Sequence, residues 1–257
     1  MKFEEKLEDI AEEHQPFFYQ GRGDAAVLLI HGFTGTPAYF QEFGRFLAEK
    51  GISVSAIRLA GHGTSLDKLA RTTYRDWQES TRLGLKKMEE KYSKIHIVGF
   101  SFGGNLAFNL INCYPSAVQK VVTVGTPTKI YRERLKNNLI PIAKMIKKYH
   151  KKSWWMKVRN ENSHVGTYQK IPYNNLQDFI RFISEFTRQE LPNVKIPALI
   201  IHSKKDIVIP PISAEYIYNN IGSEKKELFW IEKSYHNPFV DYSTPEFFEK
   251  IYNFLVR

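Results

Sequence analysis

A short buried strand, a serine flanked by glycines and a helix follow one another between residues 95 and 111. Residues 95–98 form an apolar run typical of a strand, and the apolar residues from Leu106 to Ile111 recur at helical spacing. Between them, Gly99 and Gly103 stand two residues on either side of Ser101. Glycine is needed where a tight turn brings backbones too close for a Cβ. The segment therefore predicts a sharp strand-to-helix turn with Ser101 at its apex.

Apolar runs alternate with helical patterns along most of the chain. We predict strands at 26–30, 52–59, 95–98, 121–124, 196–202 and 227–231. A helix is expected to begin at Thr36-Pro37 and end at Gly51, and the last helix to begin at Thr244-Pro245. This alternation is typical of βαβ units. It predicts an α/β fold with one mostly parallel central sheet flanked by helices.

The strand pattern stops between residues 128 and 190, where a strongly basic stretch also lies. Eleven Lys or Arg and a single acid lie between Lys129 and Arg159, so this stretch holds the whole net charge of +10. Positive charge confined to one segment indicates a local surface feature, and we expect no nucleic-acid partner. We predict an α/β core formed by residues 1–127 and 191–257, with a small basic cap (lid) inserted at 128–190.

The length and the cysteine content limit which class of protein this chain can belong to. The 257 residues fit one domain with an insertion, and the oligomeric state stays open. The chain has no apolar run long enough to span a membrane, and its acidic start does not resemble a signal peptide. One cysteine, Cys113, suits a reducing compartment. We therefore expect a cytoplasmic protein.

Ser101 needs partners before its hydroxyl can act as a nucleophile. A histidine must take the hydroxyl proton, and a carboxylate must orient that histidine. In the order serine, acid, histidine, Asp206 follows the strand at 196–202 and His236 follows the strand at 227–231. Asp241 is the rival carboxylate, but it comes after the histidine. Ser101, Asp206 and His236 are therefore the predicted catalytic triad.

An oxyanion formed during acyl transfer needs two backbone N–H donors. The residue after the nucleophile, Phe102, is one predicted donor, and Phe33 in the loop 31–35 is the other. The alternative is that this loop is only a glycine turn braced by His31. Among the other histidines, His202 is expected in the core or beside the site, His96 inside a strand, and His62 in a role that fixes the pocket loop.

These motifs as a set resemble the bacterial carboxylesterase and monoacylglycerol lipase family of α/β hydrolases. The resemblance covers nearly the whole chain outside 128–190 and rests on the segments 31–35, 61–63 and 99–104, the Asp206 loop and His236. It implies an α/β-hydrolase fold without a cofactor or metal, a small cap, and hydrolysis of short- to medium-chain acyl esters or monoglycerides. Two departures are Tyr235 and Ser203, where family members often have glycine.

Other activities remain open on the same residues. The triad could also serve thioester hydrolysis, C–C bond hydrolysis or perhydrolysis. The fold could instead serve as a lipid- or protein-binding module, although an intact triad argues against this alternative. The panel that separates these readings contains graded p-nitrophenyl esters, a monoacylglycerol and an acyl-CoA.

The basic insertion contains a candidate amphipathic helix. Ile142, Met145, Ile146 and Tyr149 are spaced for one helical face, and Pro141 suits its first turn. We favour a cap helix whose apolar face covers the active site and whose lysines face water. The alternative is a peripheral contact with an anionic membrane, to which the adjacent Trp154 and Trp155 would contribute.

Overall fold

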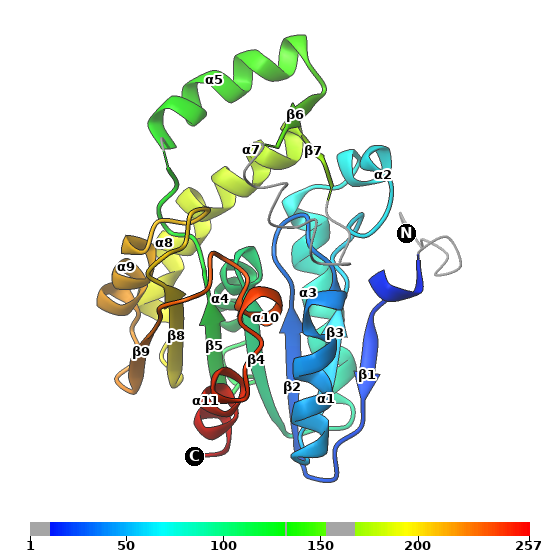
Figure 1. Cartoon of the computed structure of the whole chain (residues 1–257), viewed down its shortest axis with the longest axis vertical. Coiled ribbons are helices and arrows are strands. Elements are labelled where there is room, and N and C mark those ends of the chain that lie inside the picture. Colours follow the sequence, from blue (N-terminus) through cyan, green and yellow to red (C-terminus); the bar gives the residue numbers. More distant parts are fainter. Residues whose placement is uncertain (1–10, 132, 153–167) are drawn as a thin grey trace.

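A seven-stranded sheet forms the centre of the molecule (Figure 1). The computed structural model describes residues 11–131, 133–152 and 168–257. In spatial order β1-β3-β2-β4-β5-β8-β9, the strands are Phe17–Tyr19, Ser53–Ile57, Ala25–Ile30, Lys94–Phe100, Lys120–Val124, Ala198–Ser203 and Lys226–Ile231. All neighbours are parallel except β1, which pairs antiparallel with β3. The predicted α/β hydrolase fold is confirmed.

Helices cover both faces of this sheet because its strands are apolar on both sides. In β2, Val27 and Leu29 pack with the α1 and α11 side, while Leu28 and Ile30 pack with the α3, α4 and α9 side. The helix bounds are α1 Gln41–Glu49, α3 Tyr74–Glu89, α4 Phe102–Cys113, α9 Ile212–Asn220 and α11 Pro245–Val256. Shorter helices are α2 Leu66–Ala70, α8 Arg188–Glu190 and α10 Pro238–Asp241.

The predicted strands all form, within a few residues of their expected ends. The final helix begins at Pro245, and the Thr244 hydroxyl accepts a hydrogen bond from the Phe247 amide, as an N-cap does. The helix expected from Thr36 begins as a single 3₁₀ turn, Pro37–Phe40, before α1. The edge strand β1 was not predicted, because its three residues are too few to show a period.

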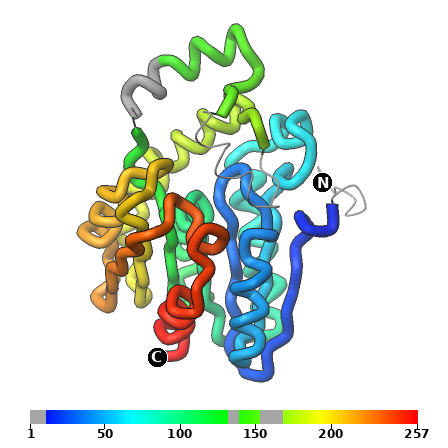
Figure 2. The backbone as a smooth tube through the Cα atoms, in the orientation of Figure 1, coloured from blue at the N-terminus to red at the C-terminus, as the bar shows by residue number. Residues whose placement is uncertain are grey.

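The inserted segment lies across the edge of the sheet where the parallel strands end (Figures 1 and 2). It contains α5 Glu133–Ile146, β6 Tyr149–Lys151, β7 Lys170–Pro172 and α7 Tyr173–Phe182, which continues as a π-helical turn at Ile183–Thr187. Strands β6 and β7 form a separate antiparallel pair that the sequence did not predict. Trp154 and Trp155 lie outside the described residues.

Helix α5 differs from the predicted amphipathic helix. Pro141 lies inside the helix, not in its first turn, and Tyr149 belongs to β6. The apolar residues also do not cover the active site: Met145 is 84% exposed and Ile146 77%. Among the α5 residues whose side chains are described, 139–146, Ile140 is the one that is buried, against the α7 side of the core. The favoured interpretation of this helix face was therefore wrong. In the described part of the chain, no helix has the length and apolarity that crossing a membrane requires.

Candidate active site

Ser101 stands at the apex of the turn from β4 into α4. Its backbone has φ 51° and ψ −121°, a conformation that costs energy for a residue with a Cβ. The turn is held by its surroundings, since the Ser101 amide donates to the Val124 carbonyl at 2.7 Å. The side chain is nearly buried, at 8% exposure. Such a strained turn presents the serine hydroxyl at the sheet edge, ahead of the first turn of α4.

The flanking glycines allow this turn because neighbouring backbones touch it. A Cβ on Gly99 would lie 2.6 Å from the Gly103 carbonyl carbon. A Cβ on Gly103 would lie 2.0 Å from the Ile30 carbonyl oxygen. Both distances are far below a normal contact, so glycine is required at 99 for β4 to turn tightly into α4, and at 103 for α4 to approach β2.

His236 lies between Ser101 and Asp206, although the three residues are far apart in the sequence. Its Nε2 is 3.2 Å from the Ser101 Oγ, and its Nδ1 is 2.7 Å from the Asp206 Oδ2. With Nδ1 donating to the carboxylate, Nε2 is free to accept the serine proton. The three residues follow β4, β8 and β9, whose carboxyl ends meet at one edge of the sheet.

Asp206 is buried but well supplied with donors. Its Oδ1 accepts the amides of Val208 and Ile209, each at 2.8 Å. His202 Nε2 also lies 3.4 Å from Oδ2, which places this histidine beside the site. Burial alone would raise the pKa of the Asp206 carboxyl. The charge of His236 and the hydrogen bonds from both histidines outweigh it and hold that pKa well below its usual range.

The rival carboxylate, Asp241, contacts the backbone of the histidine loop and not the His236 ring. Its Oδ2 accepts the amides of Tyr235 at 2.9 Å and His236 at 3.4 Å, and its Oδ1 accepts the Ser234 hydroxyl at 2.6 Å. Asp241 thus fixes the backbone of the loop that carries the histidine.

The two predicted oxyanion donors, the amides of Phe102 and Phe33, belong to segments that adjoin Ser101. Phe102 is the first residue of α4, so its N–H has no acceptor within the helix. Phe33 follows Gly32, and a Cβ on Gly32 would lie 3.0 Å from the Ser101 Cβ, so this loop passes directly beside the serine. Among the described residues, neither amide is paired with an acceptor. The two predicted donors are therefore near Ser101 and available.

His31 braces this loop, as the alternative interpretation suggested. Its Nδ1 donates to the Gly32 carbonyl at 2.9 Å, and its Nε2 accepts the Leu59 amide at 3.1 Å. His62 lies beside it, with ring centroids 5.3 Å apart, and donates from Nδ1 to the Ala60 carbonyl. Burial lowers the pKa of His31 strongly and that of His62 to about 4, so both rings are neutral at pH 7. They position loops and do not exchange protons there.

Aromatic rings from the core and the inserted segment surround this loop. Phe33 stacks on Phe179 of α7 at 5.0 Å and approaches Trp77 at 5.6 Å. Phe179 also contacts Phe102 at 5.2 Å. Phe179 could not be recognised as a site residue from the sequence, since an aromatic residue at helical spacing is typical of ordinary core. A ring from α7 therefore touches both residues that carry the candidate oxyanion amides.

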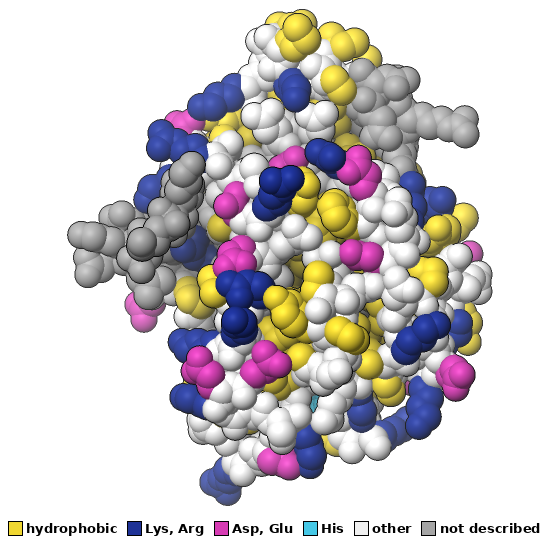
Figure 3. All heavy atoms as spheres, turned by 180° about the vertical axis from the view of Figure 1, so that it is seen from behind, with side chains coloured by type: hydrophobic (Ala, Val, Ile, Leu, Met, Phe, Trp, Pro, Cys, Tyr) yellow, Lys and Arg dark blue, Asp and Glu magenta, His cyan; other side chains and the backbone are white. Residues whose placement is uncertain are grey.

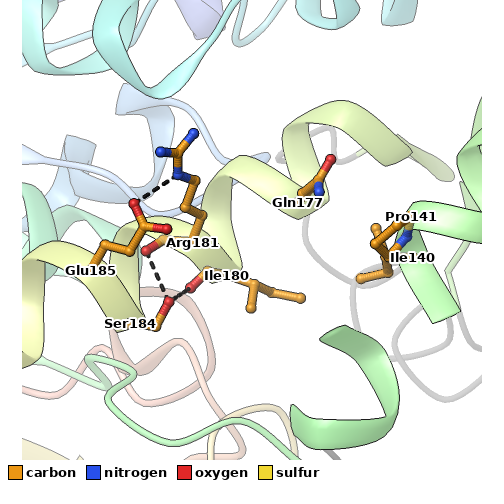
Figure 4. Close-up of a pocket in the computed structure, with 7 residues that line it drawn as sticks. All are labelled: Ile140, Pro141, Gln177, Ile180, Arg181, Ser184 and Glu185. Atoms are coloured by element: carbon orange, nitrogen blue, oxygen red, sulfur yellow. Dashed lines mark hydrogen bonds and ion pairs between the residues drawn. The ribbon is translucent and has the colours of Figure 1, made fainter. Parts of the chain in front are cut away.

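A groove of about 390 Å³ runs between α5 and α7 (Figure 4). Ile180 and Ile140 give it apolar walls, while Arg181 of α7 pairs at 2.7 Å with Glu185 in the π-helical turn that follows. It contains none of the triad residues. The described residues also contain no cluster of His, Cys, Asp and Glu side chains suited to a metal ion.

Comparisons with known proteins agree on one family. The model of the family described as serine aminopeptidase, S33, matches residues 21–243. The thermostable monoacylglycerol lipase of Bacillus sp. (strain H-257) is 30% identical and covers 93% of this chain and 94% of its own. The carboxylesterase of Bacillus subtilis (strain 168) is 30% identical and covers 95% and 96%. A solved structure from work on LipS and LipT, two metagenome-derived lipolytic enzymes, superposes with a TM-score of 0.78 at 26% identity and covers 96% of this chain and 98% of its own.

Proposed function

Because the chain belongs to the S33 serine aminopeptidase family of α/β hydrolases, we propose that Ser101, His236 and Asp206 form its catalytic triad. The protein is a serine ester hydrolase of the carboxylesterase and monoacylglycerol lipase type. Its substrates are small-molecule esters. Short- to medium-chain acyl esters or monoglycerides are the proposed range.

The observation that carries this proposal is the continuous chain of hydrogen bonds from carboxylate to hydroxyl. Asp206 binds His236 at 2.7 Å, and His236 reaches Ser101 at 3.2 Å. In the proposed reaction, His236 takes the Ser101 proton while Oγ attacks the ester carbonyl carbon. The amides of Phe33 and Phe102 bind the oxyanion that results.

The intermediate then collapses to an acyl-enzyme. His236 gives its proton to the departing alkoxide, and the alcohol leaves. Water attacks the acyl-enzyme with His236 as base again, the carboxylic acid departs, and the proton returns to Ser101 Oγ. No metal or redox group enters either half of this cycle.

The experiment combines turnover with covalent labelling. The wild-type protein should hydrolyse p-nitrophenyl butyrate and a monobutyrin, and a fluorophosphonate should label Ser101. Ser101→Ala should remove both signals while leaving the fold intact, since the substitution deletes one oxygen. Failure of the fluorophosphonate to label the wild-type protein would falsify the acyl-enzyme. An acyl-CoA and an aminoacyl p-nitroanilide test the thioester and peptide activities in parallel.

We further propose that residues 128–190 act as a lid over this site. Helix α7, β6 and β7 lie across the strand ends at which the triad is placed (Figure 1), and Phe179 packs on Phe33. Exposed apolar side chains gather at the far end of this segment, where Figure 3 shows a hydrophobic cluster at the top of the molecule. These are Leu139, Ile142, Met145 and Ile146 of α5.

Exposed lysines accompany this apolar face of α5. Lys144 of α5, Lys147 directly after it and Lys151 at the end of β6 are all exposed. Apolar side chains next to basic ones suit the interface of an anionic membrane. We therefore propose a peripheral membrane contact through α5, by which the enzyme would reach esters held in a lipid surface.

A further inference from the structure

Lys152 reaches from the inserted segment to the oxyanion loop. It directly follows β6, where its amide donates to the Gln169 carbonyl at 3.1 Å and thereby extends the pairing with β7. Its Nζ donates to the Thr34 Oγ1 at 3.0 Å. Thr34 is almost fully buried and adjoins Phe33, a proposed oxyanion donor. A cation is therefore held against the residue that follows Phe33 in the oxyanion loop, by a hairpin that belongs to the proposed lid.

The environment of this ammonium disfavours its charge. Loss of hydration lowers the pKa of Lys152 to about 8. The charge also reaches His62, where it contributes to the lowered pKa of that ring. Lys152 thus faces both loops that border the serine, 31–35 and 58–63.

Within the described residues, no carboxylate forms an ion pair with Lys152. Lys148, four residues earlier, contacts Asp67 and has a raised pKa, as a surface lysine with a partner should. The Lys152 ammonium is poorly hydrated, and its one described partner is a hydroxyl. Such a cation binds an incoming anion strongly, because much of its desolvation has already occurred on folding.

We propose that the Lys152 ammonium binds a negatively charged group of the substrate, so that the enzyme prefers anionic esters over neutral ones of the same length. The group is a carboxylate or phosphate carried by either the acyl or the alcohol part. This inference rests on the proposed ester hydrolysis and names the substrate class of that site. Lys152 is then a residue that determines specificity, and it takes no proton from the reacting atoms.

Two matched substrate pairs separate the two sources of charge. Monomethyl adipate against methyl hexanoate places the charge on the acyl part, and butyrylglycerol phosphate against monobutyrin places it on the alcohol part. We expect one pair to show a clear preference for the anionic ester in kcat/KM, and that pair identifies the side on which Lys152 lies. Hydrolysis is followed by titration of the released acid.

Variants at position 152 then test the residue. Lys152→Met should lower the ratio of anionic to neutral kcat/KM by about ten- to a hundredfold, the usual effect of losing a hydrogen bond to a charged group. Turnover of the neutral ester should fall less than that of the anionic ester, since the neutral ester carries no charge for the ammonium to bind. Lys152→Arg should keep the preference, and Lys151→Met, which removes the exposed neighbouring lysine, is the matched control.

The pH dependence of the same ratio supplies a signature that a bracing role would not give. In the wild type, the preference should fall as pH rises through about 8, because the ammonium loses its proton. In Lys152→Arg it should stay flat. The groups that face Lys152 do not confuse the result: His62 is already neutral above pH 4, the Arg58 guanidinium donates to the His62 carbonyl, and the Tyr168 hydroxyl donates to the Gly61 carbonyl. A change that affects both esters equally cancels in the ratio.

Each outcome decides the inference separately from the proposed function. Equal turnover of both members of each pair, or an equal loss for anionic and neutral esters in Lys152→Met, would overturn the role of Lys152 while ester hydrolysis stands. Absence of all ester turnover, together with absent fluorophosphonate labelling, would instead overturn the proposed function.

Discussion

Asp241 holds His236 by its backbone and not by its ring. The Asp241 Oδ2 accepts the His236 amide at 3.4 Å and the Tyr235 amide at 2.9 Å. The imidazole Nδ1 binds Asp206 instead. Two carboxylates therefore serve the same histidine in different ways, one through the orientation of its ring and the other through the position of its loop.

Replacing each carboxylate by its amide should separate these roles. Asp206→Asn should lower kcat for p-nitrophenyl butyrate by about 10⁴-fold, because the amide favours the wrong tautomer of the histidine. Asp241→Asn should cost far less, since the amide oxygen can still accept one backbone N–H. Its main effect should be a lower free energy of unfolding, measured by urea denaturation. A larger kinetic loss in Asp241→Asn would reassign the triad.

The oxyanion loop can be displaced by one methyl group. In Gly32→Ala the new Cβ would lie 3.0 Å from the Ser101 Cβ and 3.3 Å from the Phe100 carbonyl oxygen. The loop must move, and the Phe33 amide moves with it. We expect kcat to fall by about a hundredfold, typical of a lost oxyanion donor, with little change in the melting temperature. Unchanged kcat would show that Phe33 is not a donor.

Phe179 should connect the inserted segment to substrate selection. Its ring packs on Phe33 and Phe102, so Phe179→Ala opens space beside both proposed oxyanion residues. We expect the preference among p-nitrophenyl esters to shift toward longer acyl chains. Phe182→Ala is the matched control, because Phe182 also contacts Phe102, and no ring contact joins it to Phe33 among the described residues. Both variants should lose about 3–5 kcal/mol in free energy of unfolding. An equal shift in acyl-chain preference in both variants would argue against the lid.

Buried neutral histidines should make the fold less stable in mild acid. The pKa of His96 and of His62 is lowered to about 4, in both cases mainly by burial. Between pH 6.5 and 4 the unfolded chain binds protons that the folded chain refuses, so stability falls as pH falls. The loss by pH 5 is about 2 kcal/mol for each histidine. Urea unfolding at pH 7 and pH 5 measures this loss in the free energy of unfolding. His96→Leu should reduce the loss by the contribution of one histidine. If His96→Leu lost as much stability between pH 7 and pH 5 as the wild type, the lowered pKa of His96 would be contradicted.

Much of this site could be predicted from the sequence because its chemistry is tied to local patterns. The turn at Ser101 needs glycines at fixed positions, and the strands that precede Asp206 and His236 are continuous apolar runs. The chain order then placed all three at one sheet edge. The order of residues along the chain was enough to prefer Asp206 over Asp241 as the triad carboxylate. The contact of Asp241 with the His236 amide could not be predicted in this way.

The inserted segment could not be predicted in the same way. Strands β6 and β7 have three residues each, too few for a period, and they pair across 18 residues. Pro141 was expected to start a helix, yet α5 continues through it. Lys152 read as one more lysine of a solvated charge run, because only its contact with Thr34, over a hundred residues away, distinguishes it from Lys151.

The α5 surface gives the last prediction. If its apolar and basic side chains contact lipid, the protein should sediment with vesicles that contain anionic lipid, and added salt should weaken this binding by screening the lysines. Met145→Glu with Ile146→Glu should abolish it, since both side chains are mostly exposed and would enter the interface. Leu83→Glu, which changes an exposed leucine on α3, is the control and should bind as the wild type does. Equal binding to neutral vesicles, or binding by the double variant, would show that α5 is not the contact surface.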